Sequence, residues 1–192
     1  MIAIQGDVEE HVIALEKTLV ERREKGEVVK IKHQGIVDSC DAIVIPGGES
    51  TTIGRLMERE GIFQELKEAA EEEKPIWGTC AGMVLLAKEG DEEVTKTGQP
   101  LLGLMDVKVK RNAFGRQRES FEVLLKMSIF DGYFHAVFIR APAITYATDS
   151  VEVLATLNGQ IVAAKQKNIL ALSFHPELTV DRRIHHYFLD LG

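Results

Sequence analysis

The stretch Ala42-Ile43-Val44-Ile45 places four apolar residues in a row. A strand with one face in solvent alternates apolar and polar residues, whereas a continuous apolar run indicates burial on both faces. Strands buried on both faces are typical of parallel sheets that helices cover from either side. We therefore predict an α/β fold with three layers, in which a mostly parallel central sheet carries helices on both faces.

The surrounding segments of the first half support this prediction. Val12, Leu15 and Leu19 recur at helical spacing, and Gly26 follows them as a stop signal. Further strands are predicted at residues 1–4, 28–31 and 75–77, and further helices at 51–57, 62–70 and 83–88. Strand and helix therefore alternate through this half.

In the second half short strands predominate, and we expect part of this region to be antiparallel. The best two-residue hairpin signal is Asn158-Gly159. Residues 90–100 are predicted to form a surface connection. A buried strand is predicted at 169–174, and a closing helix with Asp181 as its cap at 181–191. The predicted strands between these segments are 107–110, 121–124, 133–139, 151–157 and 160–164.

Composition narrows the function classes. The chain has 192 residues, of which 45% are hydrophobic, so we expect one domain spanning residues 1–192. Its net charge of -7 argues against a nucleic-acid partner. Cys40 and Cys80 imply no disulfide framework, and neither a signal peptide nor a membrane-spanning run is evident. We therefore expect a cytoplasmic protein without a membrane partner.

Cys80 lies in Gly78-Thr79-Cys80-Ala81-Gly82, between an apolar strand and a helical run. A lone cysteine is more often a buried structural residue than a nucleophile. A sharp turn between strand and helix, however, exposes a nucleophile at the edge of the sheet, and glycines on both flanks permit that turn. The helix N-terminus also favours the thiolate form. We predict that Cys80 is a nucleophile.

His175 and Glu177 follow a buried strand later in the chain, separated by Pro176. In an extended chain, side chains two residues apart project to the same side. The Glu177 carboxylate can then orient the imidazole of His175, which acts as the base toward the thiol. A histidine packed in the core is the alternative, and we expect that ordinary role, or a surface position, for His11, His33, His135, His185 and His186.

The loop Pro46-Gly47-Gly48-Glu49-Ser50 stands between a buried strand and a helix. It could be a simple tight turn, and it fits neither of the common phosphate-binding glycine motifs. We favour an oxyanion hole, in which the N–H groups of Gly48 and Ala81 stabilise a tetrahedral intermediate.

Two arginines are candidates for binding a substrate carboxylate. Arg111 opens the segment Arg111 to Gln117, and Arg140 closes the run Phe138 to Arg140. Arginine is usually a solvated surface residue, but its planar fork can also hold a carboxylate through two hydrogen bonds.

These motifs together resemble those of the class I, triad-type glutamine amidotransferases, and more narrowly those of the family of glutaminase subunits of pyridoxal 5'-phosphate synthase. The cysteine elbow and the His-x-Glu pair resemble the wider class, and the arginine motifs and the Gly-Gly-Glu-Ser-Thr loop resemble the narrower family. The motifs are Pro46 to Thr51, Gly78 to Gly82, Arg111 to Gln117, Phe138 to Pro142 and Ser173 to Thr179.

The resemblance implies a flavodoxin-like fold of that class and a glutaminase activity. Cys80 would attack the side-chain amide of L-glutamine, ammonia would leave, and water would hydrolyse the resulting thioester. His175 and Glu177 would complete the triad, with no cofactor and no metal. The residues implied to bind glutamine are Gly47, Gly48, Glu49, Arg111, Ile139 and Arg140.

The resemblance also implies a partner, a (β/α)8-barrel synthase subunit that receives the ammonia. This synthase builds pyridoxal 5'-phosphate from ribose 5-phosphate and glyceraldehyde 3-phosphate, in complexes of twelve subunits of each kind. Docking of the barrel would activate the glutaminase and set a mobile peptide in the oxyanion loop. Family members usually begin a few residues earlier than Met1, so we expect a shortened first strand here.

Three alternatives remain at this point. The ammonia could serve another synthase, as in histidine or purine pathways, but the segment from Arg111 to Gln117 argues against that. A flavodoxin-like stress protein or chaperone would carry histidine directly after the elbow cysteine, where this chain has Ala81. A purely regulatory partner would be expected to lack the triad.

Overall fold

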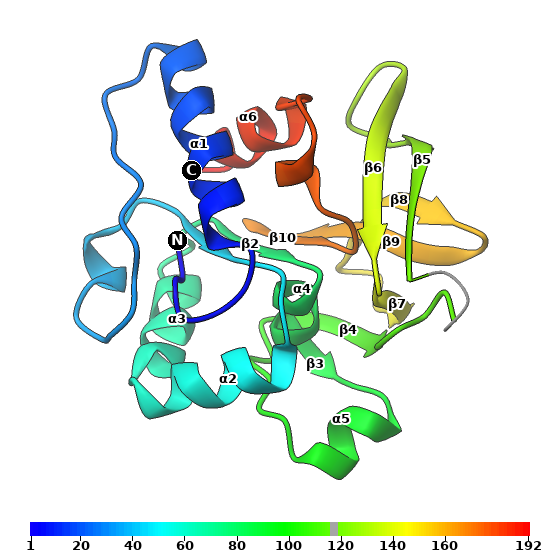
Figure 1. Cartoon of the computed structure of the whole chain (residues 1–192). Coiled ribbons are helices and arrows are strands. Elements are labelled where there is room, and N and C mark those ends of the chain that lie inside the picture. Colours follow the sequence, from blue (N-terminus) through cyan, green and yellow to red (C-terminus); the bar gives the residue numbers. More distant parts are fainter. Residues whose placement is uncertain (116–118) are drawn as a thin grey trace.

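The computed structural model describes residues 1–115 and 119–192 (Figure 1). Three adjacent parallel strands form one end of the main sheet: β1 (Ile43–Ile45), β2 (Ile76–Thr79) and β10 (Ile169–Leu172). Every residue of these strands is buried, as the apolar run at residues 42–45 predicts. The three-layer α/β prediction is confirmed.

Helices cover both faces of these three parallel strands (Figure 1). On one face lie α1 (Val8–Arg22) and α6 (Arg183–Leu189), and on the other lie α2 (Ser50–Arg59), α3 (Ile62–Glu71) and α4 (Ala81–Leu86). Side chains alternate between the two faces. Val44 and Trp77 belong to the apolar cluster of α1 and α6, whereas Ile43 and Ile76 belong to that of the other three helices.

The sheet continues beyond β10 with antiparallel strands, as expected for the second half. In order these are β9 (Gln160–Gln166), β7 (Ala143–Ala147) and β4 (Met105–Lys110), with β8 (Glu152–Leu157) paired to β9. The predicted hairpin turn at Asn158-Gly159 joins β8 to β9, and both residues have positive φ, 52° and 77°.

A separate antiparallel pair stands beside the main sheet (Figure 1). It consists of β5 (Ser120–Lys126) and β6 (Tyr133–Ile139). Phe134 and Phe138 of β6 are fully buried and pack on Phe174, the residue before the segment that carries His175 and Glu177. This hairpin therefore helps to hold that segment against the core.

The strands predicted at residues 1–4 and 28–31 are wrong as regular elements. The two segments share one parallel bridge, between Ile2 and Ile31, beside β1. The first segment turns away at Gly6, which has φ +106° and lies so close to the Gly47 carbonyl that a Cβ would approach its oxygen to 1.8 Å. This turn prevents the pairing from extending.

Other boundaries also differ from the predictions. The helix predicted at 83–88 ends at Leu86, and β3 (Ala87–Glu89) follows it and pairs parallel with β4. The surface connection at 90–100 contains α5 (Glu92–Thr97), which Asp91 caps. β7 was not predicted. Asp181 is not the cap residue of α6, because Arg182 occupies that position, although the Asp181 carboxylate accepts from the N–H of Arg183 at 3.1 Å.

Two short 3₁₀ turns complete the described elements, η1 (Val37–Ser39) and η2 (Pro176–Leu178). Among the described residues, no helix combines the length and the apolar character that crossing a bilayer requires.

Candidate active site

Cys80 occupies the turn between β2 and α4. Its backbone has φ 49° and ψ -99°, a conformation that a residue with a side chain rarely adopts and that is found at functional turns. The flanking glycines make the turn possible. A Cβ on Gly78 would approach the carbonyl carbon of Gly82 to 2.5 Å, and a Cβ on Gly82 would approach the Ile45 carbonyl oxygen to 2.3 Å.

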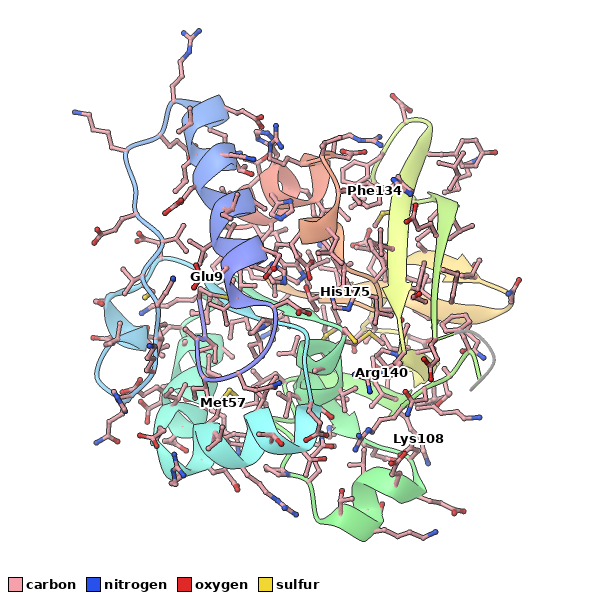
Figure 2. All side chains as sticks on the ribbon, viewed as in Figure 1. Glu9, Met57, Lys108, Phe134, Arg140 and His175 are labelled. Carbon is pink, nitrogen blue, oxygen red and sulfur yellow. The ribbon has the colours of Figure 1, made fainter. Side chains whose placement is uncertain are left out.

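His175 reaches the same edge of the sheet because β10, which precedes it, is the parallel neighbour of β2. The backbone N–H of Cys80 donates to the carbonyl of Leu172 at 2.7 Å, and that of His175 donates to Val137 of β6 at 2.8 Å. Figure 2 shows His175 near the centre of the molecule, with Arg140 toward the end of β6. Parallel topology thus joins residues 95 positions apart in sequence.

Glu177 lies in η2 directly behind His175. Its Oε1 is 2.6 Å from Nδ1 of His175, and both side chains are almost completely buried. The 3₁₀ turn, rather than the extended chain we predicted, brings them together, because Pro176 begins this turn. We call Cys80, His175 and Glu177 the candidate triad.

The surroundings of His175 favour its protonated form. Burial by itself would lower the pKa of His175, but the contacts with Cys80 and Glu177 outweigh burial and raise the pKa to about 10. Burial raises the pKa of the Glu177 carboxyl, against the opposing effect of His175. The thiol of Cys80 donates to the carbonyl of Ile139 at 3.8 Å. His175 therefore holds a proton near neutral pH, beside the thiol.

The loop from Pro46 to Ser50, called the glycine loop here, packs directly against His175 of the triad. A Cβ on Gly47 would approach Cε1 of His175 to 2.5 Å, so only glycine fits there. Gly48 has φ +143°, and the N–H of Glu49 donates to Oε1 of Gln5 at 3.0 Å. The loop is thus held by the segment before α1. Ala81, the other predicted oxyanion donor, is the first residue of α4.

The side chain of Glu49 caps α2, where its carboxylate accepts from the N–H groups of Thr51 and Thr52 at 3.1 and 2.7 Å. The same carboxylate lies 3.3 Å from Arg111. Arg111 also donates to the side chains of Thr51 and Gln99. The predicted carboxylate-binding arginine is therefore anchored on the first turn of α2.

The backbone of Arg111 is fixed as well, because its N–H donates to the Asp91 carboxylate at 2.8 Å. Arg140 is exposed, follows β6 and has φ +41°. Arg116 and Gln117, which belong to the predicted arginine motif, lie outside the described residues.

A cavity of about 520 Å³ opens over the candidate triad, and eight of the predicted site residues line it. The other two lie immediately beneath: Gly47 against the His175 ring and Glu177 on its far side. The structure therefore brings together all ten residues that the sequence singled out. The eight that line the cavity are Gly48, Glu49, Cys80, Ala81, Arg111, Ile139, Arg140 and His175.

Several neighbours of the site were not predicted from the sequence, and three of them make close contacts with predicted site residues. Asp7 lies 3.6 Å from His175, Gln99 is buried against Arg111, and His11 lies 3.4 Å from Glu177. Asp7, His175 and Glu177 could each offer one metal ligand. Two of them already pair with each other at 2.6 Å, which favours an acid–base pair over a metal site.

The fold and this site define a glutamine amidotransferase of the cysteine type. A solved structure described as a glutamine amidotransferase is 44% identical, with a TM-score of 0.89, and the match covers 99% of this chain and 96% of that one. Residues 1–191 match the SNO glutamine amidotransferase family, and the chain belongs to this family. It is therefore an enzyme.

Curated relatives agree with this placement. One from Methanococcoides burtonii is 63% identical over 99% of this chain and 96% of its own length. One from Methanosarcina mazei is 62% identical over the same shares of the two chains. Each is named "Pyridoxal 5'-phosphate synthase subunit PdxT".

Proposed function

We propose that this chain is the glutaminase subunit of pyridoxal 5'-phosphate synthase, which hydrolyses L-glutamine to L-glutamate and ammonia. The observation that carries the proposal is the buried His175–Glu177 pair, 2.6 Å apart, beside the elbow cysteine at the base of a cavity. The names of the relatives at 62 and 63% identity supply the pathway. We further propose that residues 1–192 act as one domain in the cytoplasm, where a thiol nucleophile stays reduced.

In the first half-reaction, the thiol proton of Cys80 passes to His175, which carries it as an imidazolium, and the thiolate Sγ bonds to the amide carbon of glutamine. The negative charge that develops on the amide oxygen is stabilised by the N–H groups of Gly48 and Ala81. His175 then gives its proton to the departing nitrogen as the C–N bond breaks, which leaves a glutamyl thioester and free ammonia. Glu177 holds the imidazole in place and balances its charge throughout.

In the second half-reaction, His175 removes a proton from water, whose oxygen bonds to the thioester carbon. The C–S bond breaks, glutamate leaves, and the proton returns to the Cys80–His175 pair. Arg111 holds the α-carboxylate of glutamine, and Gly47, Gly48, Glu49, Ile139 and Arg140 complete the contacts to the substrate. The position of these residues around one cavity supports this assignment.

The ammonia passes to a (β/α)8-barrel synthase subunit, which makes pyridoxal 5'-phosphate from ribose 5-phosphate and glyceraldehyde 3-phosphate. The word "subunit" in the names of the relatives supports such a partner. We propose a complex of twelve subunits of each kind. The Glu49 N–H donates to Oε1 of Gln5, and the Gly47 carbonyl accepts from the N–H of Asp7. Docking could therefore act on the oxyanion loop through the segment before α1.

The decisive experiment measures ammonia release from L-glutamine by the purified chain, alone and with an equimolar barrel subunit. Strong activation by the barrel, abolished in Cys80→Ala, is the expected result. Equal rates with and without the barrel would support the glutaminase activity and contradict the assigned pathway. Substantial ammonia release by Cys80→Ala would contradict the assignment of Cys80 as the nucleophile.

A further inference from the structure

His11 lies in the second turn of α1 and is completely buried. Its ring meets Trp77 edge-on, with the ring centroids 5.2 Å apart. Among the described residues, neither ring nitrogen has a hydrogen-bond partner. Burial of a polar ring without partners costs free energy, and an apolar side chain would fill the same space without that cost.

The ring of His11 lies beside a side chain of the candidate triad. Nε2 of His11 lies 3.4 Å from Oε2 of Glu177, and both side chains are fully buried. Oε2 likewise has no hydrogen-bond partner among the described residues, whereas Oε1 is bound to His175. Two buried polar atoms without hydrogen-bond partners thus lie within 3.4 Å of each other. Figure 2 shows the first turns of α1, marked by Glu9, beside the segment that carries His175.

We propose that His11 is a positioning residue of the triad, whose Nε2–H donates to Oε2 of Glu177 in the working enzyme. This inference rests on the proposed glutaminase function. The 3.4 Å separation exceeds an ordinary N–H···O bond by a few tenths of an ångström. Hydrogen bonds in active sites are often long in the free enzyme and tighten when substrate binds. A carboxylate held at both oxygens cannot rotate away from His175.

The charges around His11 suit this role. The titratable groups that act on it are Glu177, His175, His185 and the α-amino group of Met1. Burial, reinforced by the two other histidines and the amino terminus, holds the pKa of His11 far below its usual range. The ring is therefore neutral and carries one N–H. A neutral donor leaves the single negative charge of Glu177 to balance the protonated His175.

The chain offers a matched control in His185. This residue is also completely buried, also lacks hydrogen-bond partners for its ring nitrogens, and packs edge-on against Trp77 at 5.1 Å. His185 and His11 thus share residue type, burial and aromatic partner. They differ in that His11 alone of the two has an ion-pair contact with the triad among the described residues.

The test compares His11→Phe with His185→Phe, assayed for glutaminase in complex with the barrel subunit. His11→Phe should lower kcat about tenfold or more with an unchanged KM for glutamine. It should also move the acid limb of the kcat/KM profile to higher pH, because a carboxylate that loses a donor gains a proton more easily. His185→Phe should keep kcat and KM within about twofold of the wild-type values and should leave the acid limb in place. Equal kcat and equal acid limbs in the two variants would overturn the proposal.

A second pair of variants covers the case in which His11→Phe does not fold. Gln places its amide nitrogen near the position of Nε2, whereas Asn is too short to reach Glu177. His11→Gln should therefore retain several-fold more kcat than His11→Asn, and equal kcat in both would overturn the proposal.

Even a long N–H···O contact favours the ionised carboxylate, so a carbon-13 NMR titration of the Glu177 carboxyl in the free chain separates this inference from the proposed function. A higher pKa of Glu177 in His11→Asn than in His11→Gln supports the positioning role, whether or not the wild type releases ammonia. Absence of ammonia release by the wild type would contradict only the glutaminase proposal. The same carboxyl pKa in both variants would contradict the positioning role whatever the activity.

Discussion

Gly47 lies against His175 so closely that a Cβ on the glycine would approach Cε1 of the imidazole to 2.5 Å. The loop that precedes α2 and the segment that follows β10 are more than 120 residues apart in sequence, yet they meet with no room for a methyl group. His175 cannot yield easily, because Glu177 holds its ring from behind. A change in the glycine loop should therefore displace His175, and a shift of His175 should displace the loop.

Gly47→Ala should consequently impair catalysis more than stability. Overpacking of this kind costs about 1–3 kcal/mol, and a displaced base should lower kcat about tenfold or more. The measurement is the glutaminase rate in the complex together with thermal unfolding. Gly26→Ala is the control, since a Cβ there would meet Leu19 at an ordinary 3.5 Å. A wild-type kcat in Gly47→Ala would show that the contact is not maintained during turnover.

Arg111→Ala should chiefly raise the KM for glutamine, by about tenfold or more, because charge-assisted hydrogen bonds to the α-carboxylate are lost. The kcat should change little, since this group does not touch the reacting bond. Lys110→Ala removes the neighbouring, exposed cation and should behave as the wild type. An unchanged KM in Arg111→Ala would end its assignment as the carboxylate ligand.

Gln99→Leu should raise KM through Arg111. Oε1 of Gln99 accepts from the hydroxyls of Ser50 and Thr51, at 3.1 and 3.0 Å, and from Arg111 at 3.3 Å. Replacing Gln99 with leucine removes this acceptor and leaves buried donors unsatisfied, which lowers the free energy of unfolding by about 1–3 kcal/mol.

Steady-state kinetics and denaturant titrations on Gln99→Leu measure these two effects, and Gln64→Leu, on the exposed face of α3, is the control. A lower stability with an unchanged KM would restrict Gln99 to a structural role.

Stability should fall as the pH drops below about 6.5, in part because of His185. Burial, with Arg182 and His186 nearby, lowers the pKa of His185 to about 4. Between pH 6.5 and 4 the unfolded chain binds a proton that the folded chain excludes. Folding therefore loses up to about 1.4 kcal/mol per pH unit at this site.

His185→Phe should flatten that part of the curve, as measured by urea unfolding at several pH values. Tyr146→Phe, at an exposed position and without a group that titrates in this range, is the control and should leave the slope unchanged. The same slope for wild type and His185→Phe would contradict the low pKa.

Much of the fold was predictable because local patterns carry it. The apolar run at 42–45, the spacing of Val12, Leu15 and Leu19, and the Asn158-Gly159 turn each specify a conformation through neighbouring residues alone. The elements that were predicted wrongly or not at all lack such a local pattern. α5 has no apolar periodicity, and only its Asp91 cap signals it. The single bridge between Ile2 and Ile31 depends on how far two distant segments remain parallel before Gly6 turns the chain.

The sequence by itself determined the chemistry that the site can perform, because the elbow around Cys80 and the pair His175 and Glu177 are short-range patterns whose glycines and proline restrict the backbone locally. Tertiary structure alone decided which other residues touch them. Asp7, His11 and Gln99 carry no local signal for the site. Asp7 and His11 reach it through the packing of α1 against the sheet, and Gln99 reaches it because the connection between α5 and β4 packs on the first turn of α2. Burial and hydrogen bonding between distant segments depend on topology, which no short stretch of chain contains.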